Sequence, residues 1–419
     1  MVERRVALTV LGAVLVALVV VLAVAQSMLG SKEVGPQVVV AGSLSLGDLV
    51  AGVNGFTLNL YGLFLEGESG GNIVVSPFNV YLALTMLYEG ADSTTRGELG
   101  GAMGFNGADA CSAYQQLLSM LPLGSSGNTT LYIASGVWLR EGFPFRGDYI
   151  ARVRGCFGGE VRYFNVGELD RFVEDVNSWV SERTGGLIRD ILSRGDVDDR
   201  TVAVLVSAVY FKSLWLKEFE PYGEIKFWTG GDWVNVKAME AEGAHLKVVR
   251  GKDYVAVEIP YRDTSISIVI VMPSEFADMK ARYRELVAEA LSEIDKAKPG
   301  VYTHLVMPKF NITLRSHLKE RLEKLGIREV FTPGVADLTR MAYVKRGEMY
   351  VDETIHRAVI KVNEKGTEAA AATAVVVKVV SKPVYQEEVV INKPFIFIVR
   401  DTESKTMLFI GHVVNPNEA

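Results

Sequence analysis

Residues 363–381 read N-E-K-G-T-E-A-A-A-A-T-A-V-V-V-K-V-V-S, and this stretch decides how the fold is interpreted. Its first half is a run of small residues, from Thr367 to Ala374, with one glutamate and no proline. Its second half is rich in valine. By propensity the alanine run favours a helix and the valine run favours a strand. A segment that can adopt either conformation suits a chain that must change its pairing partners.

The composition is explained if this stretch enters a sheet as a new strand. Successive side chains of a strand face opposite sides of the sheet. One set would face the core: Thr367, Ala369, Ala371, Thr373 and Val375. The other set would face outward: Glu368, Ala370, Ala372 and Ala374. Small inward residues pass between two strands without steric cost, and Gly366 supplies a backbone hinge. An inward charge would be buried unpaired. The alternative is an alanine-rich surface helix that ends in a strand.

Length and composition limit the class of protein. The chain has 419 residues, of which 49% are hydrophobic and 22% charged, and this allows one large domain or two. The net charge of −6 argues against nucleic-acid binding. The sequence lacks C-x-x-C and H-E-x-x-H motifs, so we expect no metal and no cofactor. It also lacks a P-loop and a dinucleotide fingerprint, which argues against an enzyme.

The N-terminus is predicted to be a targeting or anchoring segment. Arg4 and Arg5 precede twenty uncharged, mostly apolar residues, 6–25. That length can span a bilayer and insert in a membrane, whereas the A-V-A at 23–25 is typical of a signal-peptide cleavage site. We therefore expect residues 1–25 to be a signal peptide or a membrane anchor, 26–46 a linker, and 47–419 a single domain outside the cytoplasm.

Two cysteines are present, Cys111 and Cys156. Outside the cytoplasm they can form a disulfide. Two separate buried thiols are the alternative that the sequence leaves open.

Hydrophobic periodicity predicts an α+β fold. Helical patterns dominate residues 46–100, apart from a short strand at 72–75, and recur at 172–183 and 314–325. Strand patterns cover 131–139, 202–211, 235–239, 254–260, 265–272, 302–310, 394–399 and 407–414. Helices dominate the first half and strands the second, without the regular alternation of a doubly wound sheet.

Short motifs mark the chain from residue 72 to residue 416. They are N-I-V-V-S-P-F-N (72–79), N-S-W-V-S-E-R-T-G-G-L-I (177–188), V-S-A-V-Y-F-K-S-L-W (206–215), H-L-V-M-P-K-F (304–310), L-G-I (325–327), A-D-L (336–338), N-K-P-F-I-F (392–397) and F-I-G-H-V-V-N-P (409–416). In this order they resemble the serpins, and residues 363–381 closely resemble the hinge of the serpin reactive loop. The resemblance implies a serpin-like α+β fold with a large central β-sheet A, additional sheets, several helices and an exposed reactive loop.

The resemblance also implies a control cluster beneath the middle of sheet A, which holds two strands until the loop arrives. The matching residues are Ser76, Asn79, Ser207 and His356. The family usually has serine in place of Asn79 and asparagine in place of Ser207, so the exchange would keep one amide and two hydroxyls near the imidazole. The alternative is that His356 is a hydrogen-bonded core histidine with no switching role.

At the top of sheet A, the resemblance implies a second group, called the breach. It consists of Trp215 under the top of the sheet and of Lys309 paired with Glu364; two solvated charges are the alternative for that pair. The implied hinge follows directly and comprises Glu364, Gly366, Thr367, Ala369, Ala370, Ala371, Ala372 and Thr373.

The family's usual spacing places the reactive-site bond sixteen residues after Glu364, at Val380–Ser381. The loop is about three residues longer than is common in the family, so cleavage after Lys378, Lys382 or Tyr385 remains an alternative. Val380 would suit elastase-like or subtilisin-like proteases. The other three residues would suit trypsin-like or chymotrypsin-like targets.

The function implied by the resemblance is single-use inhibition of a serine protease by insertion of the cleaved loop into sheet A. The alternative within the family is a non-inhibitory carrier or folding helper, whose hinge tends to contain proline or charged residues. We expect a monomer with a protease as its partner. We also expect Cys111 and Cys156 to be bonded, because the resemblance places them in neighbouring helices.

Overall fold

The computed structural model describes residues 42–67, 71–105, 107–244, 246–300, 302–352, 354–367 and 387–418. The predicted signal or anchor segment, most of the linker, the hinge residues 369–373 and the reactive-site bond at 380–381 lie outside the described residues. None of the helices formed by the described residues is long and apolar enough to cross a bilayer.

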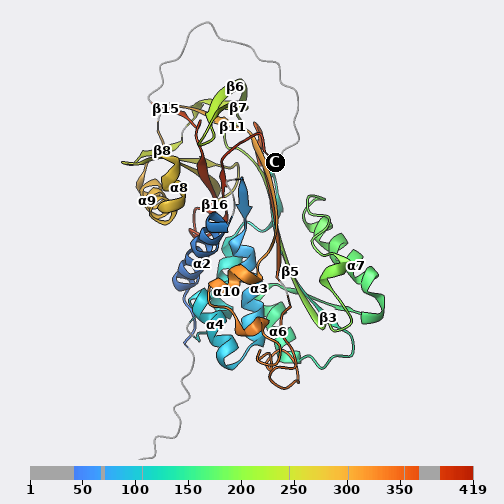
Figure 1. Cartoon of the computed structure of the whole chain (residues 1–419). Coiled ribbons are helices and arrows are strands. Elements are labelled where there is room, and N and C mark those ends of the chain that lie inside the picture. Colours follow the sequence, from blue (N-terminus) through green and yellow to red (C-terminus); the bar gives the residue numbers. More distant parts are fainter. Residues whose placement is uncertain are drawn as a thin grey trace, which may run out of the picture. The chain divides into compact units, whose positions relative to one another are not determined.

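Runs of β-branched residues assemble into three sheets, named A, B and C here (Figure 1). Sheet A has the order β12 (Phe310–His317), β13 (Ile355–Val362), β14 (Gly366–Thr367), β5 (Ala203–Leu214), β3 (Thr129–Arg140) and β2 (Gly124–Ser126), with β4 (Glu160–Phe164) parallel to β3. Sheet B has the order β1 (Ile73–Val75), β17 (Met407–Val413), β16 (Phe395–Asp401), β10 (Ile266–Pro273), β9 (Tyr254–Pro260) and β8 (Lys247–Arg250). Sheet C has the order β15 (Glu387–Val390), β11 (Thr303–Pro308), β7 (Trp233–Ala244) and β6 (Glu220–Trp228).

The helices cover these sheets. They are α2 (Leu46–Gly67), α3 (Pro77–Gly90), α4 (Ser93–Met103), α5 (Cys111–Met120), α6 (Gly147–Phe157), α7 (Leu169–Arg183), α8 (Phe276–Ala281), α9 (Tyr283–Lys296) and α10 (Lys319–Lys324). Figure 1 shows α7 on one face of β3 and β5, with α2, α3 and α6 on the other face. Sheet A is therefore covered on both sides, which explains why β5 is a nearly unbroken apolar run.

Helix α3 forms the centre of the core. Every one of its residues is buried, and it contacts β5 of sheet A and β17 of sheet B. A helix that is apolar on all sides is stable only when it is enclosed in this way. Pro77 occupies its first turn, where the missing N–H costs nothing. The residue before it, Ser76, is thereby fixed at the point where α3 starts beneath sheet A.

The prediction of a helix over residues 314–325 is wrong in its first half. Strand β12 continues to His317, and α10 begins only at Lys319. Buried Phe310 and Ile312 alternate with exposed Asn311 and Thr313, so the period of this segment is two rather than 3.6. The strand predicted at 302–310 corresponds to β11, Thr303–Pro308, and β12 begins only at its last residue, Phe310. Helices α6, α8 and α9 were not predicted, although the buried Leu286, Val287, Ala290 and Ile294 of α9 recur at helical spacing.

The domain prediction can be compared with the described part of the chain. Residues from Gly42 onward form one compact unit. Its first contacts are made with Asp109, whose N–H donates to Gly42 O at 3.1 Å and whose carbonyl accepts the N–H of Leu44 at 2.9 Å. The folded body thus begins slightly before the predicted boundary at residue 47.

Candidate functional site

The hinge begins as a tight hairpin at the carboxyl end of sheet A. Strand β13 ends at Val362, and the chain turns through Glu364 and Lys365 into β14. The backbone groups of Asn363 and Gly366 bond to each other across this turn, at 3.0 and 3.3 Å. The side chain of Asn363 also accepts the N–H of Lys365, at 3.0 Å. The turn therefore directs the hinge back between β13 and β5.

Strand β14 is already part of sheet A. Thr367 lies opposite Val362 of β13 on one side and opposite Ser213 of β5 on the other. Among the described strands, β14 is hydrogen-bonded to both β13 and β5, and β13 and β5 also contact each other directly. We call the line between β13 and β5 the seam; β14 fills its carboxyl end.

Gly366 is needed here for close approach rather than as a freely rotating hinge. A Cβ atom at this position would lie 1.9 Å from the carbonyl oxygen of Ser213. Such a distance is sterically excluded, so only glycine allows β14 to lie this close to β5. The sequence identified the residue, but the reason is packing of one backbone against another.

Thr367 faces the core, as the predicted alternation requires. It is 2% exposed, and its hydroxyl lies 2.5 Å from that of Tyr261, with which it shares a hydrogen bond. Tyr261 follows β9 and is itself buried. Its ring stacks on Trp215 at 4.5 Å and meets Phe211 edge-on at 4.9 Å. Sequence reasoning missed Tyr261, because a lone tyrosine after a strand carries no recognisable signal.

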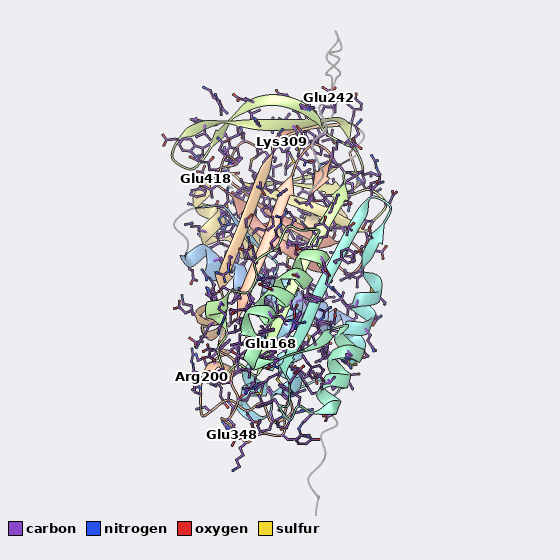
Figure 2. The ribbon with its side chains drawn as sticks, turned by 90° about the vertical axis from the view of Figure 1, so that its right-hand side faces the viewer. Glu168, Arg200, Glu242, Lys309, Glu348 and Glu418 are labelled. Atoms are coloured by element: carbon purple, nitrogen blue, oxygen red, sulfur yellow. A yellow bond between two sulfur atoms is a disulfide. The ribbon has the colours of Figure 1, made fainter. Side chains whose placement is uncertain are left out.

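The predicted breach residues come together around the hairpin. Lys309 Nζ lies 2.8 Å from Glu364 Oε1, and both side chains are mostly shielded from solvent. Trp215 is fully buried, and its indole N–H donates to the carbonyl of Asn363 at 2.8 Å. Figure 2 shows Lys309 near the end of sheet A that faces sheet C. The indole and the ion pair thus each bind one residue of the turn, Asn363 and Glu364.

The predicted control cluster is assembled in part. Ser76 and His356 are buried, and the backbone N–H of Ser76 donates to Nε2 of His356 at 3.1 Å. Burial lowers the pKa of His356 to about 4, so the imidazole is neutral and can accept this bond. The hydroxyl of Ser76 donates elsewhere, to the carbonyl of Leu408 in β17, at 2.8 Å. The expected hydroxyl contact with the imidazole is therefore replaced by a backbone contact.

The other two members of that cluster occupy neighbouring elements. Asn79 is fully buried in the first turn of α3, and its N–H bonds to Ser76 O at 3.1 Å. Ser207 lies in β5 opposite Ser135 of β3; its side chain is outside the description. The cluster thus joins α3 to β13, the strand on one side of the seam.

A cavity of about 440 Å³ lies at the opposite, amino end of the seam. It is lined by the first residues of β5 and β13 and by α3, among them Val206, Ile355, His356, Val80 and Leu84. Its rim includes Arg200 and Glu348, which Figure 2 shows at the other end of the molecule from Lys309. The seam is therefore filled by β14 at one end and hollow beneath the other.

Cys111 and Cys156 form a disulfide in this structure, with Cα atoms 4.8 Å apart. The bond joins the first residue of α5 to the end of α6. The two helices pack against each other, and α6 also contacts α3.

One further group bears on the expectation that no metal is bound. Glu240, Glu242 and His304 offer ligand atoms that lie within 4.8 Å of one another. His304 Nε2 also lies 2.9 Å from Glu240 Oε2, and the expectation that no metal is bound stays a prediction.

Comparison with known proteins agrees with this geometry. The family model described as serpin (serine protease inhibitor) matches residues 51–416. An uncharacterized serpin-like protein of Pyrobaculum aerophilum is 34% identical over 371 residues, 87% of this chain and 94% of that protein. The leukocyte elastase inhibitor of Xenopus tropicalis is 30% identical over 373 residues, 86% of this chain and 97% of that protein.

Solved structures give the same result. Serpin48 of the insect Tenebrio molitor has a TM-score of 0.73 and 25% identity, and covers 88% of this chain and 98% of its own. Thyroxine-binding globulin in complex with thyroxine has a TM-score of 0.76 at 22% identity, covers 89% of this chain and 99% of its own, and shows the fold alone. With sheet A, the hinge hairpin and the breach in place, and with the family model matching most of its length, the chain belongs to the serpin family.

Proposed function

We propose that this serpin inhibits a serine protease once, as a suicide substrate. The hydroxyl oxygen of the target's serine attacks the carbonyl of Val380. The bond between Val380 and Ser381 breaks, the new amino group of Ser381 takes a proton from the target's histidine and leaves, and an ester remains. The freed loop then inserts into sheet A before water can hydrolyse that ester.

The observation that carries this proposal is the position of β14. A loop that must become a central strand needs an entry point between two strands that run in the same direction. Gly366 and Thr367 are at that point, paired with both β13 and β5. Continuing the same strand to residue 380 adds pairing on both sides. Fourteen residues at ~3.3 Å each would extend it roughly 45 Å, which carries the attached protease far from its first position.

The cavity under the amino end of the seam supports the same path. Valine, leucine and isoleucine side chains of α3, β5 and β13 line part of it, and charged residues such as Arg200 and Glu348 line the rest. Inward side chains of an inserting strand would be buried there, each valine contributing about 1.5–3 kcal/mol. The native fold would thus store free energy that insertion releases.

A carrier function is the competing proposal. The fold does not decide between the two, since thyroxine-binding globulin shares it. The composition of the hinge favours inhibition, because residues 367–374 contain small side chains, one glutamate and no proline. A proline there would remove a ladder hydrogen bond during insertion.

The test is to incubate the purified protein with a panel of serine proteases. Elastase-like and subtilisin-like enzymes are the favoured targets, and trypsin-like and chymotrypsin-like enzymes complete the panel. We expect a covalent complex that survives denaturation, and mass spectrometry of the released C-terminal peptide should begin at Ser381. Cleavage of the loop by every protease without any complex would favour the carrier.

We further propose that the protein acts as a monomer outside the cytoplasm, secreted or anchored through residues 6–25. The predicted targeting segment and the disulfide support this location. N-terminal sequencing of the mature protein from its host would distinguish a cleaved signal from a retained anchor.

A further inference from the structure

The hydroxyl pair of Tyr261 and Thr367 joins the start of the reactive loop to the residue that follows β9 of sheet B. Tyr261 directly follows β9 of sheet B, whereas Thr367 begins the loop in sheet A. Their oxygens are 2.5 Å apart and both side chains are about 2% exposed. No solvent can replace this bond while the hinge is seated.

The phenol of Tyr261 is held rigidly in place. The carbonyl of Leu214 accepts the N–H of Arg262 at 2.8 Å, and the carbonyl of Pro260 accepts the N–H of Leu216 at 3.0 Å. These bonds flank Tyr261 on one strand and Trp215 on the other, and the two rings stack. The backbone hydrogen bonds beside Tyr261 and the stacking of its ring on Trp215 therefore both orient the hydroxyl towards the seam.

The phenol of Tyr261 in turn depends on Thr367 for its hydrogen bond. Among the described residues, Thr367 is the hydrogen-bond partner of this phenol. Burial raises the pKa of Tyr261 far above its usual range, so the hydroxyl keeps its proton. Withdrawal of the hinge would leave a buried phenol without a partner, which is unfavourable.

We propose that Tyr261 is a positioning residue for the reactive loop. It holds Gly366 and Thr367 in the seam before cleavage, so that insertion starts from an existing pair of strand contacts rather than from a closed sheet. The inference has two parts. The effect of Tyr261 on loop insertion rests on the proposed inhibitory function. The position of Gly366 and Thr367 in the seam, called the seated hinge below, can be measured without any protease.

The experiment is a double-mutant cycle with Tyr261→Phe and Thr367→Val, read by amide hydrogen exchange of the hinge. Each variant removes one hydroxyl and keeps the size of its side chain. We expect each single variant to open the hinge about tenfold more often, as expected for one hydrogen bond of ~1.4 kcal/mol. The double variant should open no more than either single one, because the same bond is lost.

The matched control is Tyr149→Phe. Tyr149 is a buried tyrosine of α6, and its hydroxyl has no hydrogen-bond partner among the described residues. Hinge exchange should be unchanged in this variant. Two results would refute the proposal that Tyr261 holds the hinge in the seam. One is unchanged hinge exchange in Tyr261→Phe, and the other is hinge exchange near a hundredfold faster than wild type in the double variant.

The second readout is the partition between covalent complex and cleaved product with a target protease. Tyr261→Phe should raise the cleaved fraction severalfold. Faster hinge exchange with an unchanged partition would refute the role in insertion while leaving inhibition intact. Absence of any complex with the wild-type protein would refute inhibition, and the exchange data would still decide the seated hinge.

Discussion

Replacing Thr367 with arginine should convert the inhibitor into a substrate. The wild-type side chain is 2% exposed and faces the core beside Tyr261. Arginine at this position cannot follow the strand without burying its guanidinium, which remains charged at any relevant pH. The hinge would have to leave the seam, and insertion after cleavage would have to bury the charge.

The magnitude follows from two losses. A buried unpaired charge costs about 3–5 kcal/mol, and the buried phenol of Tyr261 without its partner costs about 1–3 kcal/mol. Together they exceed about 4 kcal/mol, which slows insertion roughly a thousandfold if most of the cost is present in the transition state. Hydrolysis of the ester then finishes first.

The assay compares complex and cleaved protein on a denaturing gel at several ratios of inhibitor to protease. The matched control is Glu368→Arg, which places the same charge on the neighbouring residue, where the alternation predicts an outward side chain. We expect the control to form complex and Thr367→Arg to be cleaved. A stable complex at wild-type stoichiometry in Thr367→Arg would refute the insertion path proposed above.

Three further predictions concern stability. Limited proteolysis between residues 374 and 388 should raise the melting temperature, because the nicked loop can add a strand; an unchanged or lower value would contradict a metastable fold. The bond between Cys111 and Cys156 closes a 45-residue loop, worth about 4 kcal/mol in the chain-entropy model; thiol counting in the denatured, unreduced protein should find none free, and reduction should lower the urea midpoint. Burial keeps His356 neutral and lowers its pKa to about 4. Its contribution to the free energy of unfolding is therefore fully present above pH 6.5 and falls by roughly 3 kcal/mol as the pH drops towards 4. Unfolding of His356→Gln should therefore depend less steeply on pH in this range, and equal slopes would contradict the assignment.

Much of the fold could be predicted because its strands carry strong local patterns. Strands β16 and β17 are buried throughout, and their mostly apolar sequences matched the expected segments to within about two residues. β12 was missed because an edge strand with one polar face, such as Asn311 to Arg315, has enough polar residues to resemble an amphipathic helix. Local pattern alone does not separate these two cases.

The candidate site could be predicted only where a residue acts through the chemistry of its own side chain. A glutamate and a lysine can be matched to a motif, and the contact of Lys309 with Glu364 has the expected geometry. The role of Ser76 could not be found this way, since it contacts His356 through its backbone N–H, which every non-proline residue possesses. Tyr261 could not be predicted either, because its hydrogen-bond partner, Thr367, is distant in sequence.

The turn at Glu364 and Lys365 has a consequence for assembly of many copies. A strand tethered by so short a link is present at its own seam at an effective concentration in the millimolar range or above. The loop of another molecule competes only at its bulk concentration, and it must also displace the bond to Tyr261. Mass action therefore opposes exchange of this strand between copies, the event that leads to domain swapping. A substitution that loosens the turn would lower the protein concentration at which such exchange begins.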